Sequence, residues 1–285
     1  MRLPSFGPTS EYYSLVAHGY DLISDIYDDV ELENSINNRL RKRMQSALLS
    51  AFRPGFRVLE IGSGTGIEAL ALAAFGVEVL ATDISQRMVD LLQKRAYDAG
   101  LRNLACRRMP AHDVGTLVQE FGEGSFDGAY SHGGVLNFEP RLPVIAQQMA
   151  RLLRPGGKFI CSVVNQASLF EILFYPLVLR PRKAFRRLGH DVPVPITCHP
   201  SQRNYVIPTR FYSPRAFLRF FNGGFALRRL EGLQILLPPW NLAVEYDRVG
   251  PISRIAGLLE DRLADKAPFN EWGYLFLAEL ERRDE

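Results

Sequence analysis

The chain has 285 residues, of which 47% are hydrophobic and 23% charged, a composition that fits one globular α/β domain with additions. A net charge of only +3 gives no global field that favours nucleic acid, and no DNA partner is expected. The three cysteines, Cys106, Cys161 and Cys198, lie far apart without a C-x-x-C pair, so neither a disulfide framework nor a zinc site is indicated. The first residues lack a signal-peptide core and no apolar run reaches the ~18 residues of a membrane span, so we expect a cytoplasmic protein.

Residues 9–52 are predicted to form a helical segment before the first strand. Tyrosines and aspartates are interleaved in its first half, as at Tyr20 and Asp21, and residues 32–52 predict an amphipathic helix that ends before Pro54. The plainest interpretation is a helix that docks on the sheet through its tyrosines.

Residues 57–61 are an apolar run typical of a buried strand, and they lead into the sequence G-S-G-T-G at 62–66 and an apolar helix at 67–74. Glycine suits this junction because a ligand must approach the main chain closely at the helix N-terminus. Dinucleotides place a pyrophosphate there with the spacing G-x-G-x-x-G, whereas the spacing here is G-x-G-x-G. Glu60, beside the turn, would repel a pyrophosphate and attract the ammonium and sulfonium groups of S-adenosylmethionine. The electrostatics therefore favour a cationic nucleoside.

The next predicted strand, residues 77–83, ends in Asp83. An aspartate at this place can accept two charge-assisted hydrogen bonds from ribose hydroxyls, or it can cap the following helix, which Ser85 is also able to do. Ile84 and Met88 then offer an apolar surface for adenine. The sequence thus predicts a nucleoside contact at the end of the second strand.

Two more strands are predicted at residues 104–109 and 125–131, and the second of these ends at Ser131, just before His132. Ligands of open α/β sheets lie beyond the carboxyl ends of strands near the switch point, so His132 is expected to face the reacting group. A histidine, with its unperturbed pKa of about 6.5, suits a general base. The alternative is a satisfied polar residue, hydrogen-bonded to cofactor or backbone.

This ordered series resembles the class I S-adenosylmethionine-dependent methyltransferases of the small-molecule type, over about residues 12–158 and more loosely to the C-terminus. Their first motif, E/D-x-G-x-G-x-G, is matched by Glu60, Gly62, Gly64 and Gly66, and their L-L-R-P-G-G sequence before an apolar strand recurs at 152–157. The resemblance implies an α/β, Rossmann-like sheet of seven mostly parallel strands flanked by helices, in the order 3-2-1-4-5-7-6.

The resemblance also implies the cofactor S-adenosylmethionine and a set of contacts to it. The predicted contacts are Tyr20, Glu60, Gly62, Ser63, Gly64, Gly66, Asp83, Ile84, Met88, Ala111, His112 and Ser131. The family's usual aspartate and alanine after the third strand are replaced by P-A-H-D at 110–113, which leaves Asp113 or nearby main-chain groups to bind the adenine amino group.

Residues 9–52 resemble the lid that closes over cofactor and acceptor in this family. Tyr20 is then a cofactor contact, and His132 or His18 is the candidate base where the acceptor must lose a proton.

Residues 165–212 break the pattern as a long insertion between the fifth and sixth strands. The insertion begins with an apolar stretch at 169–179, and arginines and a lysine follow from Arg180 onward. We interpret the insertion as a substrate cap with an apolar wall and a basic edge, suited to an acid-bearing hydrophobic acceptor or to peripheral contact with an anionic membrane. A solvated basic helix that covers the sheet is the alternative. His190 and His199 lack a ligand set, so no metal site is expected.

These features predict a single methyltransferase domain over residues 1–285 that transfers a methyl group in line to a small, apolar or carboxylate-bearing metabolite, as in natural product biosynthesis. Three alternatives remain open: a nicotinamide-dependent oxidoreductase on the same fold class, a non-catalytic S-adenosylmethionine-binding protein, and an RNA methyltransferase that uses the basic cap. The sequence identifies neither the acceptor, nor the methylated atom, nor the oligomeric state.

Overall fold

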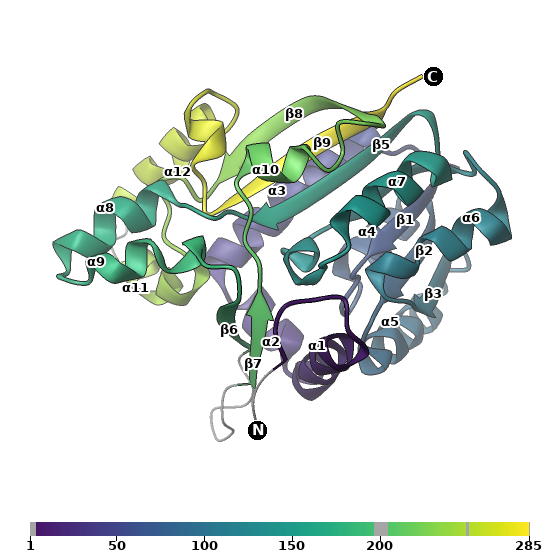
Figure 1. The fold of residues 1–285 in the computed structure, drawn as a ribbon, viewed down its shortest axis with the longest axis horizontal. Coiled ribbons are helices and arrows are strands. Elements are labelled where there is room, and N and C mark those ends of the chain that lie inside the picture. Colours follow the sequence, from purple (N-terminus) through teal and green to yellow (C-terminus); the bar gives the residue numbers. More distant parts are fainter. Residues whose placement is uncertain (1–3, 197–204, 249–250, 285) are drawn as a thin grey trace.

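The computed structural model describes residues 4–196, 205–248 and 251–284, so the predicted cap residues Cys198, His199 and Arg203 lie outside the described residues. Figure 1 shows a central sheet with helices on both faces and a further group of elements to one side. The strands of the central sheet are β1 (Arg57–Ile61), β2 (Glu78–Asp83), β3 (Leu104–Arg108), β4 (Phe126–Ser131), β5 (Leu153–Val164), β8 (Phe225–Leu233) and β9 (Leu275–Arg282).

The sheet order is β3-β2-β1-β4-β5-β9-β8. Strands β1 to β5 run parallel, and β9 runs antiparallel to both β5 and β8. Numbered within this sheet alone, the order is 3-2-1-4-5-7-6, which confirms the predicted fold class and topology, because β6 and β7 form a separate two-stranded sheet. The order reverses between β1 and β4, and at such a switch point the carboxyl ends of the strands open a crevice.

The remaining elements surround this sheet. The helices are α1 (Ser10–Ile23), α2 (Tyr27–Leu32), α3 (Ser35–Ala51), α4 (Ile67–Ala74), α5 (Gln86–Asp98), α6 (Gly115–Phe121), α7 (Leu142–Leu152), α8 (Leu169–Leu177), α9 (Pro181–Ala184), α10 (Pro214–Leu218), α11 (Ala243–Arg248) and α12 (Pro251–Leu263), and the small sheet pairs β6 (Val192–Ile196) with β7 (Tyr205–Thr209). Short 3₁₀ turns are found at Ala111–Asp113, Val135–Phe138, Arg186–Leu188, Trp240–Leu242 and Phe269–Glu271. Within the described ranges, no helix is long and apolar enough to cross a membrane.

Successive residues of β1 enter opposite cores, because side chains alternate along a strand. Leu59 and Ile61 pack into the core on the side of α6 and α7, whereas Val58 packs on the side of α3, α4 and α5. Glu60 follows the alternation onto the side of Val58, where it is 1% exposed. A carboxyl group is thereby buried at the end of the first strand, on the face that the N-terminal helices cover.

The N-terminal helices are fastened to the glycine turn and to α5. The prediction of one helix over residues 32–52 is wrong at its start: α2 ends at Leu32, and the Asn34 side chain caps α3 by accepting hydrogen bonds from the Ile36 and Asn37 amides. Two aspartates of the N-terminal helices then contact the glycine turn and the start of α5. Asp21 accepts a hydrogen bond from the Ser85 hydroxyl, 2.5 Å away, and Asp28 accepts one from the Thr65 hydroxyl, also 2.5 Å away.

The insertion between β5 and β8 has two structural parts. Helices α8 and α9 contact each other at one end of the molecule (Figure 1), and the β6–β7 sheet packs against α1. The Tyr12 hydroxyl on α1 donates a hydrogen bond to the Pro208 carbonyl at 3.0 Å, and Ile196 and Ile207 share a buried cluster with α1. The β6–β7 part therefore lies against the N-terminal helices rather than out in solvent.

Candidate functional site

The glycine turn after β1 has a backbone that only glycine adopts freely. Gly62, Gly64 and Gly66 have φ values of 73°, 52° and 85°. A Cβ atom on Gly62 would lie 2.4 Å from both methyl groups of Val135. Position 62 therefore also requires glycine because a side chain would clash with Val135. The amides of Gly62 and Ser63 both donate to the Thr82 carbonyl and hold the turn beside β2.

A cleft opens at the carboxyl ends of β1, β2 and β4, beneath the N-terminal helices. Its empty volume, including the part open to solvent, is about 1060 Å³. The lining residues are Tyr13, Val16, Tyr20, Tyr27, Glu31, Arg41, Glu60, Ile61, Gly62, Ser63, Gly64, Thr65, Ile67, Glu68, Asp83, Ile84, Met109, Pro110, Ala111, His132, Gly133, Val135, Phe138 and Glu139. All of the following predicted residues thus line this cleft: Tyr20, Glu60, Gly62, Ser63, Gly64, Asp83, Ile84, Ala111 and His132.

Carboxyl groups dominate the charge of this cleft. Glu31, Glu60, Glu68, Asp83 and Glu139 line it, and the fixed cation among the described lining residues is Arg41. Such a surface favours a ligand with positive charge and opposes a pyrophosphate.

Glu60 is the most buried of these acids. Its carboxyl lies next to the buried hydroxyl of Tyr130, the polar group that interacts with it in the interior. Burial raises the pKa of Glu60 well above the ordinary value for a carboxyl, and the nearby Glu68 carboxylate raises it further. A cationic group placed beside Glu60 would reverse this shift and restore the charged form.

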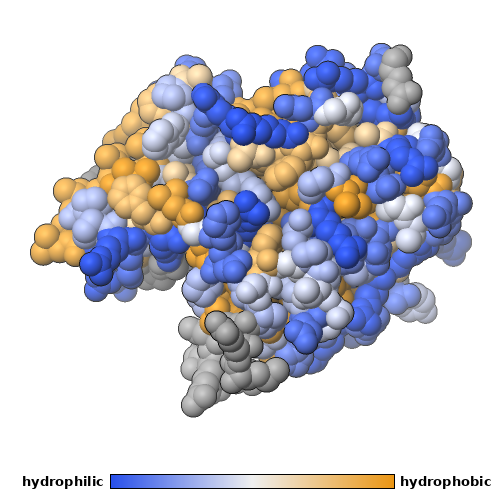
Figure 2. Space-filling model, viewed as in Figure 1, coloured by the Kyte–Doolittle hydropathy of each residue, from blue (hydrophilic) through white to orange (hydrophobic). Residues whose placement is uncertain are grey.

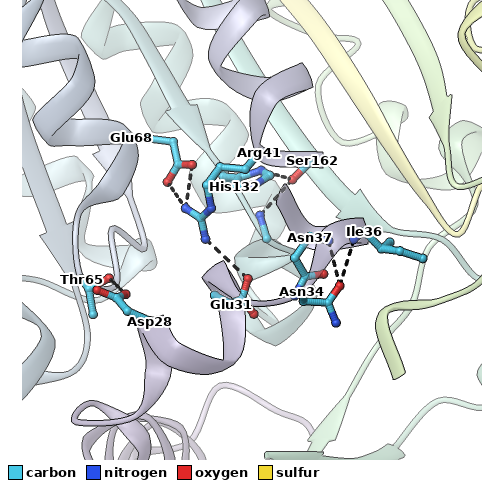
Figure 3. A network of polar contacts seen from close by, with 11 residues as sticks. Asp28, Glu31, Asn34, Ile36, Asn37, Arg41, Thr65, Glu68, His132 and Ser162 are labelled. Atoms are coloured by element: carbon cyan, nitrogen blue, oxygen red, sulfur yellow. Dashed lines mark hydrogen bonds and ion pairs between the residues drawn. The ribbon is translucent and has the colours of Figure 1, made fainter. Parts of the chain in front are cut away.

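Arg41 on α3 lines the cleft and links α2 to α4 through its guanidinium group (Figure 3). Its guanidinium donates to both carboxylate oxygens of Glu68, at 2.8 and 2.9 Å, and to Glu31 at 3.4 Å. The Arg41 Nε atom is buried without a partner in the described structure. Arg41 therefore balances the acids of the cleft.

Asp83 ties the glycine turn to the start of α5. Its two oxygens accept hydrogen bonds from the amides of Gly64 and Ser85, each at 2.8 Å. Ser85 is the N-cap of α5 through its own hydroxyl, so the helix does not depend on Asp83 for that role. Burial raises the pKa of the Asp83 carboxyl, while the amides of Ser85 and Gly64 lower it. Each carboxylate oxygen retains a lone pair for a further donor such as a hydroxyl.

His132 is held by Ser162 on β5 (Figure 3). The Nδ1 atom lies 3.0 Å from the Ser162 hydroxyl oxygen, which also accepts the Gly133 amide at 2.9 Å. Burial lowers the pKa of His132 below its usual 6.5, so the ring is neutral at physiological pH. With Nδ1 engaged, Nε2 is the nitrogen left for a ligand.

Two predicted candidates lie outside the cleft wall. The ring of His18 packs edge-on against Tyr205, with 5.6 Å between centroids. The ring of His112 lies 4.1 Å from that of Tyr13 and its Nδ1 is 3.2 Å from a Glu139 oxygen, so it supports the wall from behind. Their roles stay predictions.

Three other predicted contacts are covered by neighbouring side chains. Met88 is fully buried in the core between α1 and α5, and the Ser131 hydroxyl donates to the Ile61 carbonyl at 2.9 Å. A Cβ on Gly66 would lie 2.0 Å from a Leu92 methyl, so Gly66 serves close packing of α5 on the turn. Asp113, the suggested substitute for the missing adenine acceptor, is likewise absent from the lining residues.

Sequence reasoning missed Glu31, Arg41, Glu68 and Ser162. Arg41 is one of several basic residues on α3, and Glu68 is an acid in the first turn of a helix, where acids are common. A local signal existed only for Glu68, which follows the glycine turn by two residues.

The strands that form the cleft belong to a segment that is similar to a known protein family. Residues 59–161, which run from β1 into β5, match the protein family described as Methyltransferase domain. The chain therefore carries a methyltransferase domain. This match confirms the family predicted from the glycine motif.

Curated relatives share only part of their length with this methyltransferase domain and its additions. The chain is 34% identical over 116 residues to the biotin biosynthesis bifunctional protein BioHC of Cellvibrio japonicus, covering 41% of this chain and 21% of that protein. It is 32% identical over 147 residues to a demethylmenaquinone methyltransferase of Beutenbergia cavernae, covering 52% of this chain and 54% of that protein. The chain thus spans at most about half the length of these two relatives.

Solved structures share the fold over nearly the whole chain. The [4+2]-cyclase SpnF has a TM-score of 0.63 at 16% identity and covers 99% of this chain and 100% of its own. The geranyl diphosphate C-methyltransferase from Streptomyces coelicolor A3(2), solved with Mg²⁺, geranyl diphosphate and S-adenosyl-L-homocysteine, has a TM-score of 0.60 at 14% identity and covers 97% and 99%. At these identities the likeness shows the fold of the methyltransferase domain and its additions, not a substrate.

Proposed function

We propose that this chain is a methyltransferase that holds S-adenosylmethionine in the acidic cleft and transfers its methyl group to a small apolar or carboxylate-bearing acceptor. The observation that carries the proposal is the buried Glu60 carboxyl, which lines the cleft beside the glycine turn together with Asp83. The bound cofactor supplies an electrophilic methyl group on a sulfonium that becomes a neutral leaving group.

The residues of the cleft fit the charged groups of this cofactor. Glu60 and Glu68 provide negative potential for an ammonium and a sulfonium group, and Asp83 keeps acceptor capacity for ribose hydroxyls. The guanidinium of Arg41 suits the carboxylate of the methionine portion. Ile84 and Ala111 offer an apolar edge for adenine.

The contribution of the protein to the reaction is alignment and exclusion of water. In-line transfer requires the acceptor atom, the methyl carbon and the sulfur to be collinear, and holding them so supplies much of the rate. Tyr20, Tyr27 and Phe138 line the cleft on the side of the N-terminal helices, with the rings of Tyr20 and Phe138 edge to face at 5.9 Å. These rings favour an acceptor with an apolar body. The names of two similar proteins, a demethylmenaquinone methyltransferase and a geranyl diphosphate C-methyltransferase, point to acceptors of the same character.

Calorimetry and a transfer assay test this proposal in sequence. We expect S-adenosylmethionine and S-adenosylhomocysteine to bind and NAD to show no heat, because the cleft is acidic. Methyl-labelled cofactor incubated with a metabolite extract should then yield a labelled small molecule. Binding of NAD instead would contradict the proposal, whereas cofactor binding without any transfer would assign the chain to the non-catalytic binding proteins.

Replacing Asp83 tests the ribose contact. We expect Asp83→Ala to weaken S-adenosylmethionine binding about 10- to 150-fold, since a hydrogen bond to a charged group contributes about 1.5–3 kcal/mol. Asp83→Asn keeps one acceptor oxygen and should fall between Asp83→Ala and the wild type. Asp98→Ala, an exposed acid on α5, serves as the matched control, and unchanged affinity of Asp83→Ala would refute the assignment.

Replacing His132 separates a base from a binding residue. We expect His132→Ala to lower kcat about 100-fold, the lower end of general-base effects, with cofactor affinity nearly unchanged. Because burial lowers its pKa, His132 stays neutral to lower pH than a free histidine, so wild-type turnover should be flat above about pH 7 and fall only in acid. Equal losses of turnover and cofactor affinity would instead make His132 a binding residue. Ser162→Ala should give a smaller loss of turnover, because it frees the ring without removing it.

A further inference from the structure

One end of the molecule carries a concentration of exposed apolar side chains. They are Leu173, Leu177, Val178, Leu179, Phe185 and Leu188, all on α8, α9 and the turns beside them, and are called here the apolar tip. Leu177 is 81% exposed and Leu179 is 90% exposed. Figure 2 shows apolar residues gathered at the left end of the molecule, where Figure 1 labels α8 and α9. Single exposed apolar residues are ordinary, but a gathered patch marks a surface that meets something else.

The apolar tip is fixed to the body of the protein by a buried ion pair. Glu171, which is 0% exposed, pairs with Arg187 and, at 3.1 Å, with Arg186. The Arg187 guanidinium lies 4.3 Å from the centroid of the Tyr274 ring and donates to the Tyr274 carbonyl at 3.3 Å. Because α8 is anchored in this way, the exposure of its outer face belongs to the folded protein.

The backbone at Leu179 closes the C-terminal end of α8. Its φ of 58° lies in the left-handed region, where glycine or asparagine would be less strained than leucine. The Leu179 side chain does not fill the core, since it is almost fully exposed. The left-handed conformation belongs to the C-terminal cap of α8, in which the amides of Leu179 and Arg180 donate to the carbonyls of Pro176 and Tyr175 at 3.0 and 2.9 Å. The cap therefore fixes the backbone that carries the exposed Leu179 side chain.

Exposed cations lie within the segment that forms the apolar tip. Arg180, Arg182 and Lys183 are exposed between its two groups of apolar residues. Over residues 169–190 the single acid is Glu171, and it is buried and paired. Within residues 169–190 the exposed charges are all cationic, and the exposed Asp191 follows them in the chain. An apolar protrusion with such cations matches the boundary of a bilayer, where apolar side chains enter the acyl region and Arg or Lys meets lipid phosphates.

We propose that the apolar tip docks this chain onto the surface of anionic lipid bilayers, with α8 and α9 lying in the interface. The nine residues of α8 are far too few to span a bilayer, so the contact is peripheral. This proposal stands apart from methyl transfer, because α8 and α9 contribute no residue to the cleft wall.

The experiment is sedimentation of the full-length protein with vesicles. Phosphatidylcholine vesicles with and without phosphatidylglycerol are compared, and we expect binding to depend on the anionic lipid and to weaken at high salt. The double variant Leu177→Glu, Leu179→Glu should lower binding at least about tenfold. Tyr97→Glu is the matched control, because Tyr97 is 85% exposed on α5 and far from the apolar tip in sequence.

A second pair of variants tests the cations. Arg180→Glu with Arg182→Glu should abolish the preference for anionic vesicles, whereas Lys94→Glu with Arg102→Glu, which changes two exposed cations on and after α5, should leave it. Absence of wild-type binding to anionic vesicles overturns the proposal, as does unaltered binding of the leucine variant. A dimer in solution that the leucine variant dissociates also overturns it, and assigns the apolar tip to a second copy of the chain. Cofactor affinity, measured on the same variants, should be unchanged throughout, so that a failure here is distinct from a failure of the methyltransferase proposal.

Discussion

Arg41→Met is expected to destabilise the folded protein by about 3–5 kcal/mol at neutral pH, the usual loss when one partner of a buried ion pair is removed. Arg41 is 8% exposed and Glu68 4%, so solvent cannot take over the role of the guanidinium. The variant leaves Glu68 without its cation and Glu31 and Glu60 without their nearest opposing charge. Urea unfolding of the variant and the wild type measures the difference.

The loss should depend on pH in a defined direction. Burial raises the pKa of Glu31 and of Glu60, and Arg41 lowers both, so its removal raises them further. A carboxyl whose pKa is higher in the folded than in the unfolded state binds more protons when folded, so it opposes folding increasingly as pH rises through the folded-state pKa. The deficit of Arg41→Met should therefore be small near pH 4, below the unfolded pKa of about 4.3, and reach its full size towards pH 7–8.

Two further variants separate this cause from general damage to α3. Lys42→Met makes the same change at the next, exposed position and should alter stability by less than about 0.5 kcal/mol. The double variant Arg41→Met, Glu68→Gln removes the ion pair together with its unpaired acid and should recover part of the loss. A deficit of Arg41→Met that is the same at pH 4 and pH 8 would contradict the electrostatic account.

The first half of the cleft was predictable from sequence because its residues are local to one motif. The strand, the glycine turn and the acid before it occupy residues 57–66, and each is required by a neighbour within a few positions. Asp83 was found for the same reason, since it ends the next strand and parallel neighbours bring their carboxyl ends together.

The second half of the cleft comes from long-range contacts that no local pattern encodes. Arg41 and Glu68 are 27 residues apart, and His132 and Ser162 are 30 apart. Which arginine of α3 turns inward depends on how that helix is rotated against the sheet, and the sequence around Arg41 offers several basic residues of similar helical spacing. The rotation follows from packing of Ile36, Met44 and Leu48, which the amphipathic pattern only outlines.

The contact set implied by resemblance was broader than the wall that the structure forms. Met88 and Ser131 come from segments that border the cleft, but each turns its side chain into the core or onto a strand carbonyl. A one-residue step along a strand reverses the face of a side chain, so a position next to a true lining residue, such as Ser131 beside His132, can be predicted for the wall and lie behind it.

The glycine turn gives the other large expected effect. Gly62→Ala should destabilise the protein by about 2–5 kcal/mol, as the sum of about 1–2 kcal/mol for a side chain in the left-handed region and about 1–3 kcal/mol for overpacking. The two parts have separate structural causes, a φ of 73° and a Cβ position 2.4 Å from the Val135 methyl groups. Cofactor affinity should fall as well, because the displaced Val135 lines the cleft.

Gly55→Ala isolates the backbone part of that effect. Gly55 has a φ of 83°, yet a Cβ there would meet nothing within 4 Å, so this control should lose only about 1–2 kcal/mol and leave cofactor affinity unchanged. Combining Gly62→Ala with Val135→Ala removes the crowding, and the double variant should be more stable than the sum of the two single losses predicts. If Gly62→Ala and Gly55→Ala lose equal stability, then close packing of the turn against Val135 is not what requires glycine at position 62, and the contact that shapes this wall of the cleft has been misassigned.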